Sequence, residues 1–201
     1  MNHLAHLLLA GPDPDHRLGA LLADHVKGRL ALQALPDGVR SGVVLHRRID
    51  AWTDAHPTVV ELRARTGPGW RRYSGVILDV LFDAMLVRNW SRYSAMPLPD
   101  FARSIDRMLL ERQAELPLRL RRFSLWARQV GLWTRYDERA MLDDIFARLA
   151  RRHGRPGPLA NGTALLDRFG LDIERAFLEL FPDLTERSAR FRASQTDDAP
   201  S

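Results

Sequence analysis

Two histidines, two aspartates and two adjacent arginines lie within the twelve residues of the segment His46–Pro57. If this segment is helical, His46 and Asp50 lie one turn apart on the same face. An imidazole and a carboxylate on one face can share a divalent metal ion. The adjacent guanidinium groups of Arg47 and Arg48 can hold a phosphate. The spacing therefore predicts metal-assisted phosphoester chemistry rather than a purely structural role.

A second pair of carboxylates lies in the apolar segment 76–87, where Asp79 and Asp83 are the only charged residues. A helix that is apolar on nearly every side is expected to be buried. A buried carboxylate is costly unless it is paired, hydrogen-bonded or bound to a cation. Two carboxylates spaced i and i+4 favour a shared cation, and the alternative is that each pairs with one of the many arginines.

Two further places carry candidate ligands. Asp24 follows an apolar run, and Lys27 comes three residues later. The two side chains either form a surface ion pair worth tenths of a kcal/mol or place Asp24 at a metal and Lys27 at a phosphate oxygen. His6 projects from the first apolar helix, where a lone histidine is usually a packed core residue. The other candidate ligands make a functional role the stronger interpretation here.

The tryptophans have helical neighbours and are expected first to pack in the core or at an interface. Trp126 and Trp133 have a second interpretation, because each lies beside a leucine in the sequence. These residues could instead form an apolar wall for a ligand tail.

Apolar residues recur with helical spacing along nearly the whole chain, and strand-like alternation is rare. We therefore expect an all-α protein with a single compact helical domain over residues 1–193. The polar residues 194–201 are expected to form a disordered tail. Helices are expected at about residues 2–10, 16–31, 36–53, 57–66, 70–93, 98–115, 117–130, 136–153, 158–169 and 172–192.

Composition excludes several functional classes. The 201 residues include no cysteine, which excludes disulfides, zinc–thiolate sites and cysteine nucleophiles. A Walker loop, a Gly-x-Ser-x-Gly elbow and a His-Glu-x-x-His motif are absent from the sequence. The net charge is +5 and nearly all the positive charge is arginine, which fits either a GC-rich genome or an acidic partner. No apolar run could span a bilayer, and we interpret the N-terminal segment as a buried helix of a cytoplasmic protein.

The sequence resembles the acyl carrier protein phosphodiesterase family, also called acyl carrier protein hydrolases. The matching segments occur in the family's order and spacing, and each is weak alone but fairly specific in combination. One position departs from the pattern, because Ala84 stands where the family usually has a histidine. The second half of the chain, from about Pro97, offers little to match residue by residue. The matching segments are Asn2–Leu7, Gly19–Gly28, His46–Asp54 and Leu78–Asp83.

The resemblance implies a distant variant of the HD-type metal-dependent phosphohydrolases that uses Mn²⁺ or Mg²⁺. The family removes the 4′-phosphopantetheine arm from the serine of holo-acyl carrier protein and returns the apo form. Histidine and aspartate ligands would hold the cation and lower the pKa of a water that attacks phosphorus. Lys27, Arg47 and Arg48 would neutralise phosphate charge. An arginine-rich face would steer the acidic carrier protein.

We therefore expect a Mn²⁺- or Mg²⁺-dependent phosphodiesterase acting on holo-acyl carrier protein, with no nucleic-acid or membrane partner. One alternative is an HD-type phosphohydrolase of a nucleotide or another small phosphoester. The other is a non-catalytic binder of an acidic protein or RNA, against which the buried carboxylate pair argues. The expected metal ligands are Asp24, His46, Asp50, Asp79 and Asp83, and the expected catalytic residues are His6, Lys27, Arg47, Arg48 and Asp54.

Overall fold

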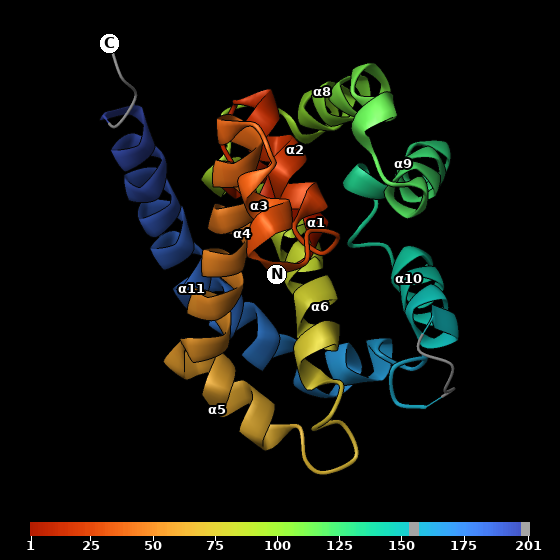
Figure 1. Cartoon of the computed structure of the whole chain (residues 1–201). Coiled ribbons are helices and arrows are strands. Elements are labelled where there is room, and N and C mark those ends of the chain that lie inside the picture. The colour runs from red at the N-terminus through yellow and green to blue at the C-terminus, as the bar shows by residue number, and fades with distance from the viewer. Residues whose placement is uncertain (153–156, 198–201) are drawn as a thin grey trace.

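The computed structural model describes residues 1–152 and 157–197. These ranges consist of helices joined by turns and short loops, and they contain no β-strand (Figure 1). The all-α prediction is therefore confirmed. The α-helices are α1 (His3–Leu9), α2 (Pro14–Leu22), α3 (Gly28–Gln33), α4 (Asp37–Ala55), α5 (Pro57–Arg65), α6 (Ser74–Arg88), α7 (Trp90–Tyr93), α8 (Leu98–Glu111), α9 (Leu118–Val130), α10 (Arg139–Arg152) and α11 (Thr163–Asp197), with short 3₁₀ helices at Gln113–Glu115 and Leu132–Thr134.

Helix α6 is the central element of the fold. Ten of its fifteen residues are buried, and it packs against α1, α10 and α11. Figure 1 shows α6 in the middle of the molecule, with α4 and α11 on one side and α9 and α10 on the other. The buried apolar residues form one continuous core that runs from Met1 to Phe191. The short helix α1 is held in this core, since Leu4 and Leu7 are fully buried.

Helices α2 and α4 cross unusually closely because each has a glycine at the crossing. A Cβ atom added at Gly19 would lie 2.1 Å from the carbonyl oxygen of Val39, and one at Gly42 would lie 2.2 Å from that of His16. Neither position has room for any side chain. This contact fixes α4, which carries His46 and Asp50, against the N-terminal part of the chain.

The expected helix over residues 16–31 is wrong in one place. Helix α2 ends at Leu22, and a turn separates it from α3. The amides of His25 and Val26 both donate to the carbonyl of Leu22, which closes the end of α2. Gly28 then has a φ of 82°, a left-handed conformation that a continuous helix cannot contain. The turn over residues 23–27 therefore projects its side chains differently from a helix.

Other boundaries shift by a few residues. The segment expected at 70–93 is two helices that meet at Asn89, whose side chain donates to the carbonyl of Met85. The break expected between residues 169 and 172 appears as non-helical backbone at Phe169 inside α11. Helix α11 then extends to Asp197, so residues 194–197 of the expected tail are helical. Residues 198–201 of that tail, and residue 153 at the end of one expected helix, lie outside the described residues.

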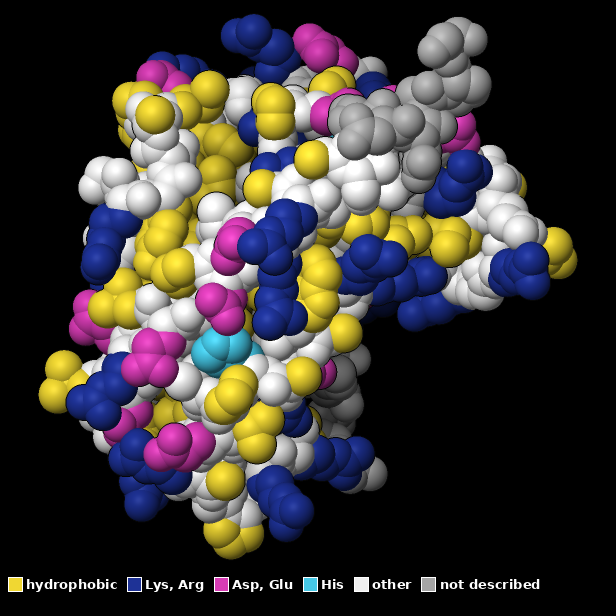
Figure 2. Space-filling model, turned by 90° about the vertical axis from the view of Figure 1, so that its left-hand side faces the viewer, with side chains coloured by type: hydrophobic (Ala, Val, Ile, Leu, Met, Phe, Trp, Pro, Cys, Tyr) yellow, Lys and Arg dark blue, Asp and Glu magenta, His cyan; other side chains and the backbone are white. Residues whose placement is uncertain are grey.

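The surface of the described residues mixes charges of both signs. Figure 2 views the molecule from the left-hand side of Figure 1, and acidic, basic and apolar side chains are interspersed over this face. The excess of basic residues is therefore not gathered there. No helix within the described ranges is long and apolar enough to cross a membrane.

Candidate metal centre and cavity

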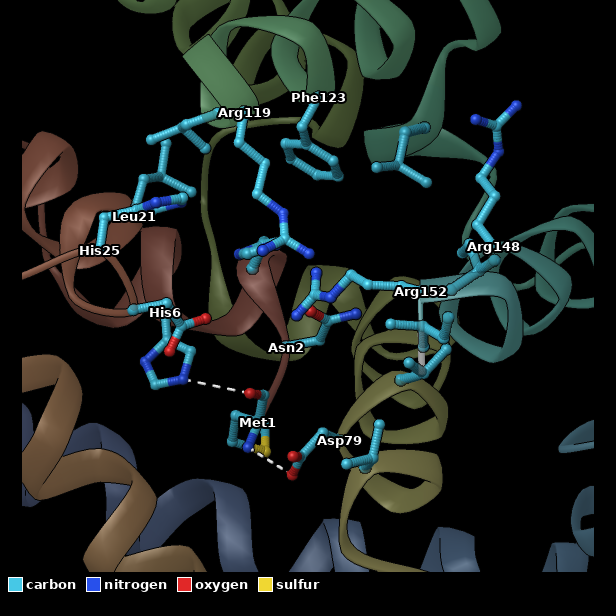
Figure 3. Close-up of a pocket in the computed structure, with 18 of the residues that line it drawn as sticks. Met1, Asn2, His6, Leu21, His25, Asp79, Arg119, Phe123, Arg148 and Arg152 are labelled. Carbon is cyan, nitrogen blue, oxygen red and sulfur yellow. Dashed lines mark hydrogen bonds and ion pairs between the residues drawn. The ribbon is translucent and has the colours of Figure 1, made fainter. Parts of the chain in front are cut away.

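A cavity of about 870 Å³ opens between the N-terminal helices and the pair α9 and α10. Its lining comes from α1, the turn between α2 and α3, α4, α6, α9 and α10. Figure 3 shows His6, Met1 and Asp79 at one end, and arginines reaching in from the opposite walls. The cavity therefore joins residues that are far apart in the sequence.

The closest cluster of possible metal ligands is formed by His6, His46 and Asp50 at one end of this cavity. The Nε2 atom of His6 lies 3.0 Å from Oδ1 of Asp50, and Nε2 of His46 lies 3.2 Å from Oδ2. The two imidazoles stack with their ring centroids 3.7 Å apart. One potential ligand atom from each residue falls within 4.8 Å of the others. The i, i+4 pair expected on α4 is thus completed by His6 from α1.

His6 and Asp50 fit a divalent cation in their protonation as well as in their geometry. Burial, together with the nearby charge of His46, lowers the pKa of His6 to about 3, so its ring is neutral at neutral pH and can act as a ligand. Burial opposes ionisation of Asp50, but hydrogen bonds from His46 and His6 outweigh it and hold the pKa of this carboxyl well below its usual range. The buried Nδ1 atoms of His6 and His46 have no partner among the described residues. A possible His-His-Asp metal site is therefore present.

Asp79 lies beside this cluster and also lines the cavity. The N-terminal ammonium group of Met1 is 2.7 Å from Oδ1 of Asp79 and 3.8 Å from Oδ1 of Asp50. Burial raises the pKa of Asp79, and the positive charge of the ammonium opposes that rise. Asp79 therefore pairs with the N-terminal ammonium group, and neither an arginine nor Asp83 shares this contact among the described residues.

Asp83 has a different environment from the one expected of a metal ligand. It is completely buried and does not line the cavity. Its two carboxylate oxygens accept the backbone amides of Leu4 at 2.8 Å and Ala5 at 3.2 Å. Asn2, at the N-cap of α1, makes no side-chain cap, so Asp83 supplies the acceptors that the first turn of α1 lacks. Asp83 thus fixes α1, and with it His6, to α6.

The environment of Asp83 predicts a pH-dependent contribution to stability. Burial raises its pKa to about 7, against the opposing effect of the two amide donors. Because the folded-state pKa exceeds the unfolded value, the protonated carboxyl stabilises the fold at low pH, and this contribution is lost as the pH rises through 7. We compare the unfolding free energy of the wild type with that of Asp83→Asn. The difference between them is expected to fall by up to roughly 4 kcal/mol from pH 4 to pH 7, at 1.36 kcal/mol per pKa unit.

Denaturant unfolding of both proteins at pH 4, 5.5 and 7 measures this difference. The histidines His3 and His6 have lowered pKa values and give the opposite slope. Their contribution is common to both proteins and cancels in the comparison. A difference that stays constant with pH would contradict the assignment.

The structure brings two more of the expected residues to the cavity. Asp24 and Lys27 both line it, and they do so from the turn that replaces the expected continuous helix. Neither side chain makes a hydrogen bond or an ion pair of 4 Å or less with another described residue. Their side chains are exposed at the cavity, which leaves them available to a ligand.

Arg47, Arg48 and Asp54 are not brought to the cavity. Arg47 donates to the carbonyl of Val26 at 2.8 Å. The guanidinium of Arg48 lies 4.6 Å from the ring centroid of Phe191 in α11. Asp54 accepts from Arg63 at 2.9 Å on the exposed side of α4. Arg47 and Arg48 lie on other faces of α4 than His46 and Asp50, and Asp54 lies one turn beyond Asp50, near the exposed end of the helix. Nearness in sequence therefore does not place these three side chains at the same site.

Ala84 is fully buried in the core and does not line the cavity. The departure from the family pattern at this position therefore lies one residue beyond Asp83, inside α6 and away from the cluster of His6, His46 and Asp50. A larger side chain at this position would have to fit within the packed core.

The wall that α9 and α10 contribute is not expected from the sequence. Trp126 lines the cavity, as its second interpretation proposed, whereas Trp133 is buried and donates to Asp106 at 2.9 Å. The wall combines apolar side chains with five arginines. The sequence carries a weak indication of this basic wall, since several of these arginines are spaced i, i+3 or i, i+4. Such pairs are common in a chain with 30 basic residues. The arginines are Arg119, Arg122, Arg148, Arg151 and Arg152.

An all-α fold with a His-His-Asp cluster at one end of a basic-walled cavity defines a helical protein with the features of a metal-dependent hydrolase. A family model described as acyl carrier protein phosphodiesterase matches residues 1–184, and the chain belongs to this family. The family name indicates a phosphodiesterase, which is a hydrolase. The resemblance seen in the four N-terminal segments is thus confirmed.

Relatives that carry the same name match along nearly the whole chain. The acyl carrier protein phosphodiesterase of Yersinia pestis is 32% identical over 189 residues, which cover 94% of this chain and 97% of the relative. That of Serratia proteamaculans is also 32% identical over 189 residues, which again cover 94% of this chain and 97% of the relative. That of Escherichia coli O6:H1 is 32% identical over 194 residues, covering 94% of this chain and 98% of its own length. No solved structure matches the chain.

Proposed function

We propose that the protein is a cytoplasmic phosphodiesterase that depends on Mn²⁺ or Mg²⁺ and hydrolyses the 4′-phosphopantetheine arm from holo-acyl carrier protein. The observation that carries this proposal is the cluster of His6, His46 and Asp50 at the end of the large cavity. Membership of the acyl carrier protein phosphodiesterase family supports the choice of substrate. The HD-like architecture stays a prediction.

In this proposal His6, His46 and Asp50 hold the cation. Two nitrogens and a carboxylate oxygen suit a divalent transition metal, and the hard oxygen ligands of Asp79 and Asp24 nearby suit Mn²⁺ or Mg²⁺. When bound, the cation would supply Lewis acidity and an activated water for attack on phosphorus. The hydrolysis breaks a phosphoester bond, adds water across it, and leaves the carrier protein with a free serine hydroxyl.

The remaining residues bind and position the substrate. The cavity volume lies within the range of about 300–1,000 Å³ that small-molecule sites occupy. Lys27 lines the cavity and can contribute positive charge to the phosphodiester. Arg47 and Asp83 act indirectly, because Arg47 holds the turn that carries Lys27, and Asp83 holds α1. A carrier protein that is acidic complements the net charge of +5.

The direct test is incubation of the purified protein with Mn²⁺ and holo-acyl carrier protein. We expect conversion to the apo form, detected by mass spectrometry as the loss of the phosphopantetheine arm, and we expect EDTA to prevent it. Parallel reactions with a panel of nucleotides test the alternative substrate class. Faster hydrolysis of a nucleotide than of the carrier protein, or no loss of the arm, would overturn the proposal.

A further inference from the structure

Two arginines at the cavity have side chains without a partner among the described residues. The guanidinium groups of Arg119 on α9 and Arg152 at the end of α10 make no hydrogen bond, and no ion pair of 4 Å or less, with any residue that the structure describes. Many arginines elsewhere are engaged, as shown by the Arg139–Asp167 and Arg65–Asp172 pairs. Even Arg148, on the same wall, is 2.9 Å from Asp144 and stacks on a tryptophan ring. Arg122 and Arg151 of the same wall also lack such a partner among the described residues, so the pair is set apart by the approach of its two guanidinium groups.

The two guanidinium groups approach each other across the cavity. Figure 3 shows Arg119 descending from α9 and Arg152 extending from α10, with the side chain of Asn2 below the end of Arg152. Burial lowers the pKa of Arg152, the charge of Arg119 lowers it further, and Asp24 opposes both effects. The helix dipole favours an arginine at the end of α10, but it gives no reason for Arg152 to face a second arginine. An anion between the two groups would relieve this repulsion.

The arginine pair lies near the His-His-Asp cluster. His3 lines the same cavity, and its pKa is lowered to about 4, first by burial, with Asp24 opposing and the charges of His46 and Arg152 adding to the effect. The charges of His46 at the metal centre and of Arg152 thus both act on this one imidazole. A phosphodiester held between them would contact both.

We propose that Arg119 and Arg152 form the phosphate-binding pair of this cavity and hold the non-bridging oxygens of the phosphodiester on the side away from His6, His46 and Asp50. This inference rests on the proposed function and assigns its phosphate contacts to α9 and α10 rather than to Arg47 and Arg48. Guanidinium groups suit this role because their planar donors can bond two phosphate oxygens at once. The apolar side chains between them on the wall, such as Phe123 and Trp126, can pack against the uncharged part of the arm.

Binding of the reaction product, without turnover, tests the pair directly. The probe is 4′-phosphopantetheine, titrated calorimetrically into metal-free protein, with pantetheine as the matched ligand that lacks the phosphate. We expect Arg119→Gln and Arg152→Gln each to weaken 4′-phosphopantetheine binding about tenfold or more, which is 1.4 kcal/mol per tenfold step. Pantetheine binding should be the same in all the proteins. Arg152→Lys, which keeps the charge, should retain part of the affinity.

Arg128→Gln is the matched control, because Arg128 is an exposed arginine on α9 that does not line the cavity. It should bind 4′-phosphopantetheine as the wild type does. Unchanged binding of 4′-phosphopantetheine to Arg119→Gln and Arg152→Gln would overturn the inference. Weaker binding of holo-acyl carrier protein to the same variants would not rescue it, because that pattern would indicate contact with the protein part of the substrate. The wild type could also bind 4′-phosphopantetheine through the two arginines and yet not hydrolyse holo-acyl carrier protein. That result would overturn the proposed function and support the assignment of Arg119 and Arg152 as the phosphate-binding pair.

Discussion

Asp50→Asn is expected to abolish metal binding and to lower the rate of holo-acyl carrier protein hydrolysis roughly 10³-fold, since metal-ion catalysis contributes several kcal/mol and each 1.36 kcal/mol is a factor of ten. Asp50 has this effect because its two oxygens contact both His6 and His46. Asparagine keeps the shape of the side chain but removes the negative charge that a divalent cation requires. Metal content after dialysis against Mn²⁺ and the initial rate of apo-protein formation measure the two losses.

A control on the same helix separates charge from position. Asp37 is in the first turn of α4, is almost fully exposed and, within the described ranges, pairs only with Arg40. Asp37→Asn should therefore keep both metal content and rate. A wild-type rate in Asp50→Asn with unchanged metal content would show that the metal lies elsewhere in the cavity.

Local spacing predicted the part of the site that lies within one helix. His46 and Asp50 are four residues apart on α4, and helical geometry alone brings them into contact. The same reasoning failed for Arg47 and Arg48, because consecutive residues of a helix point in different directions. The rule that buried carboxylates need partners was sound for Asp83. Its partners are backbone amides 78 and 79 residues away, which no local pattern indicates.

The arginine wall could not be predicted for a similar reason. Arg119 and Arg152 meet only because α9 and α10 pack around the same cavity, and the sequence separation between the two residues carries no signal of this contact. The turn at residues 23–27 depends on the left-handed conformation of Gly28, which a glycine permits but does not require. The periodicity of apolar residues therefore predicted the helices. Which side chains line the cavity depends instead on how those helices pack together.

The close crossing of α2 and α4 predicts a large loss of stability on substitution of either glycine. In Gly19→Ala the new Cβ would lie 2.1 Å from the carbonyl oxygen of Val39, and in Gly42→Ala it would lie 2.2 Å from that of His16. Both contacts are with backbone, which cannot rotate away, so the helices must separate. Overpacking of a core typically costs 1–3 kcal/mol, and we expect about 3 kcal/mol or more here. Urea unfolding followed by circular dichroism measures the loss.

The effect should also reach the metal centre, because α4 carries His46 and Asp50 while His6 lies on α1, which packs against α2. Any separation of α2 from α4 moves His6 relative to its partners. We therefore expect the glycine variants to lose metal affinity under conditions in which they are still folded. Gly69→Ala is the matched control, since its Cβ would have no neighbour within 4 Å. If Gly42→Ala were as stable as Gly69→Ala, the close crossing would not be a determinant of the fold.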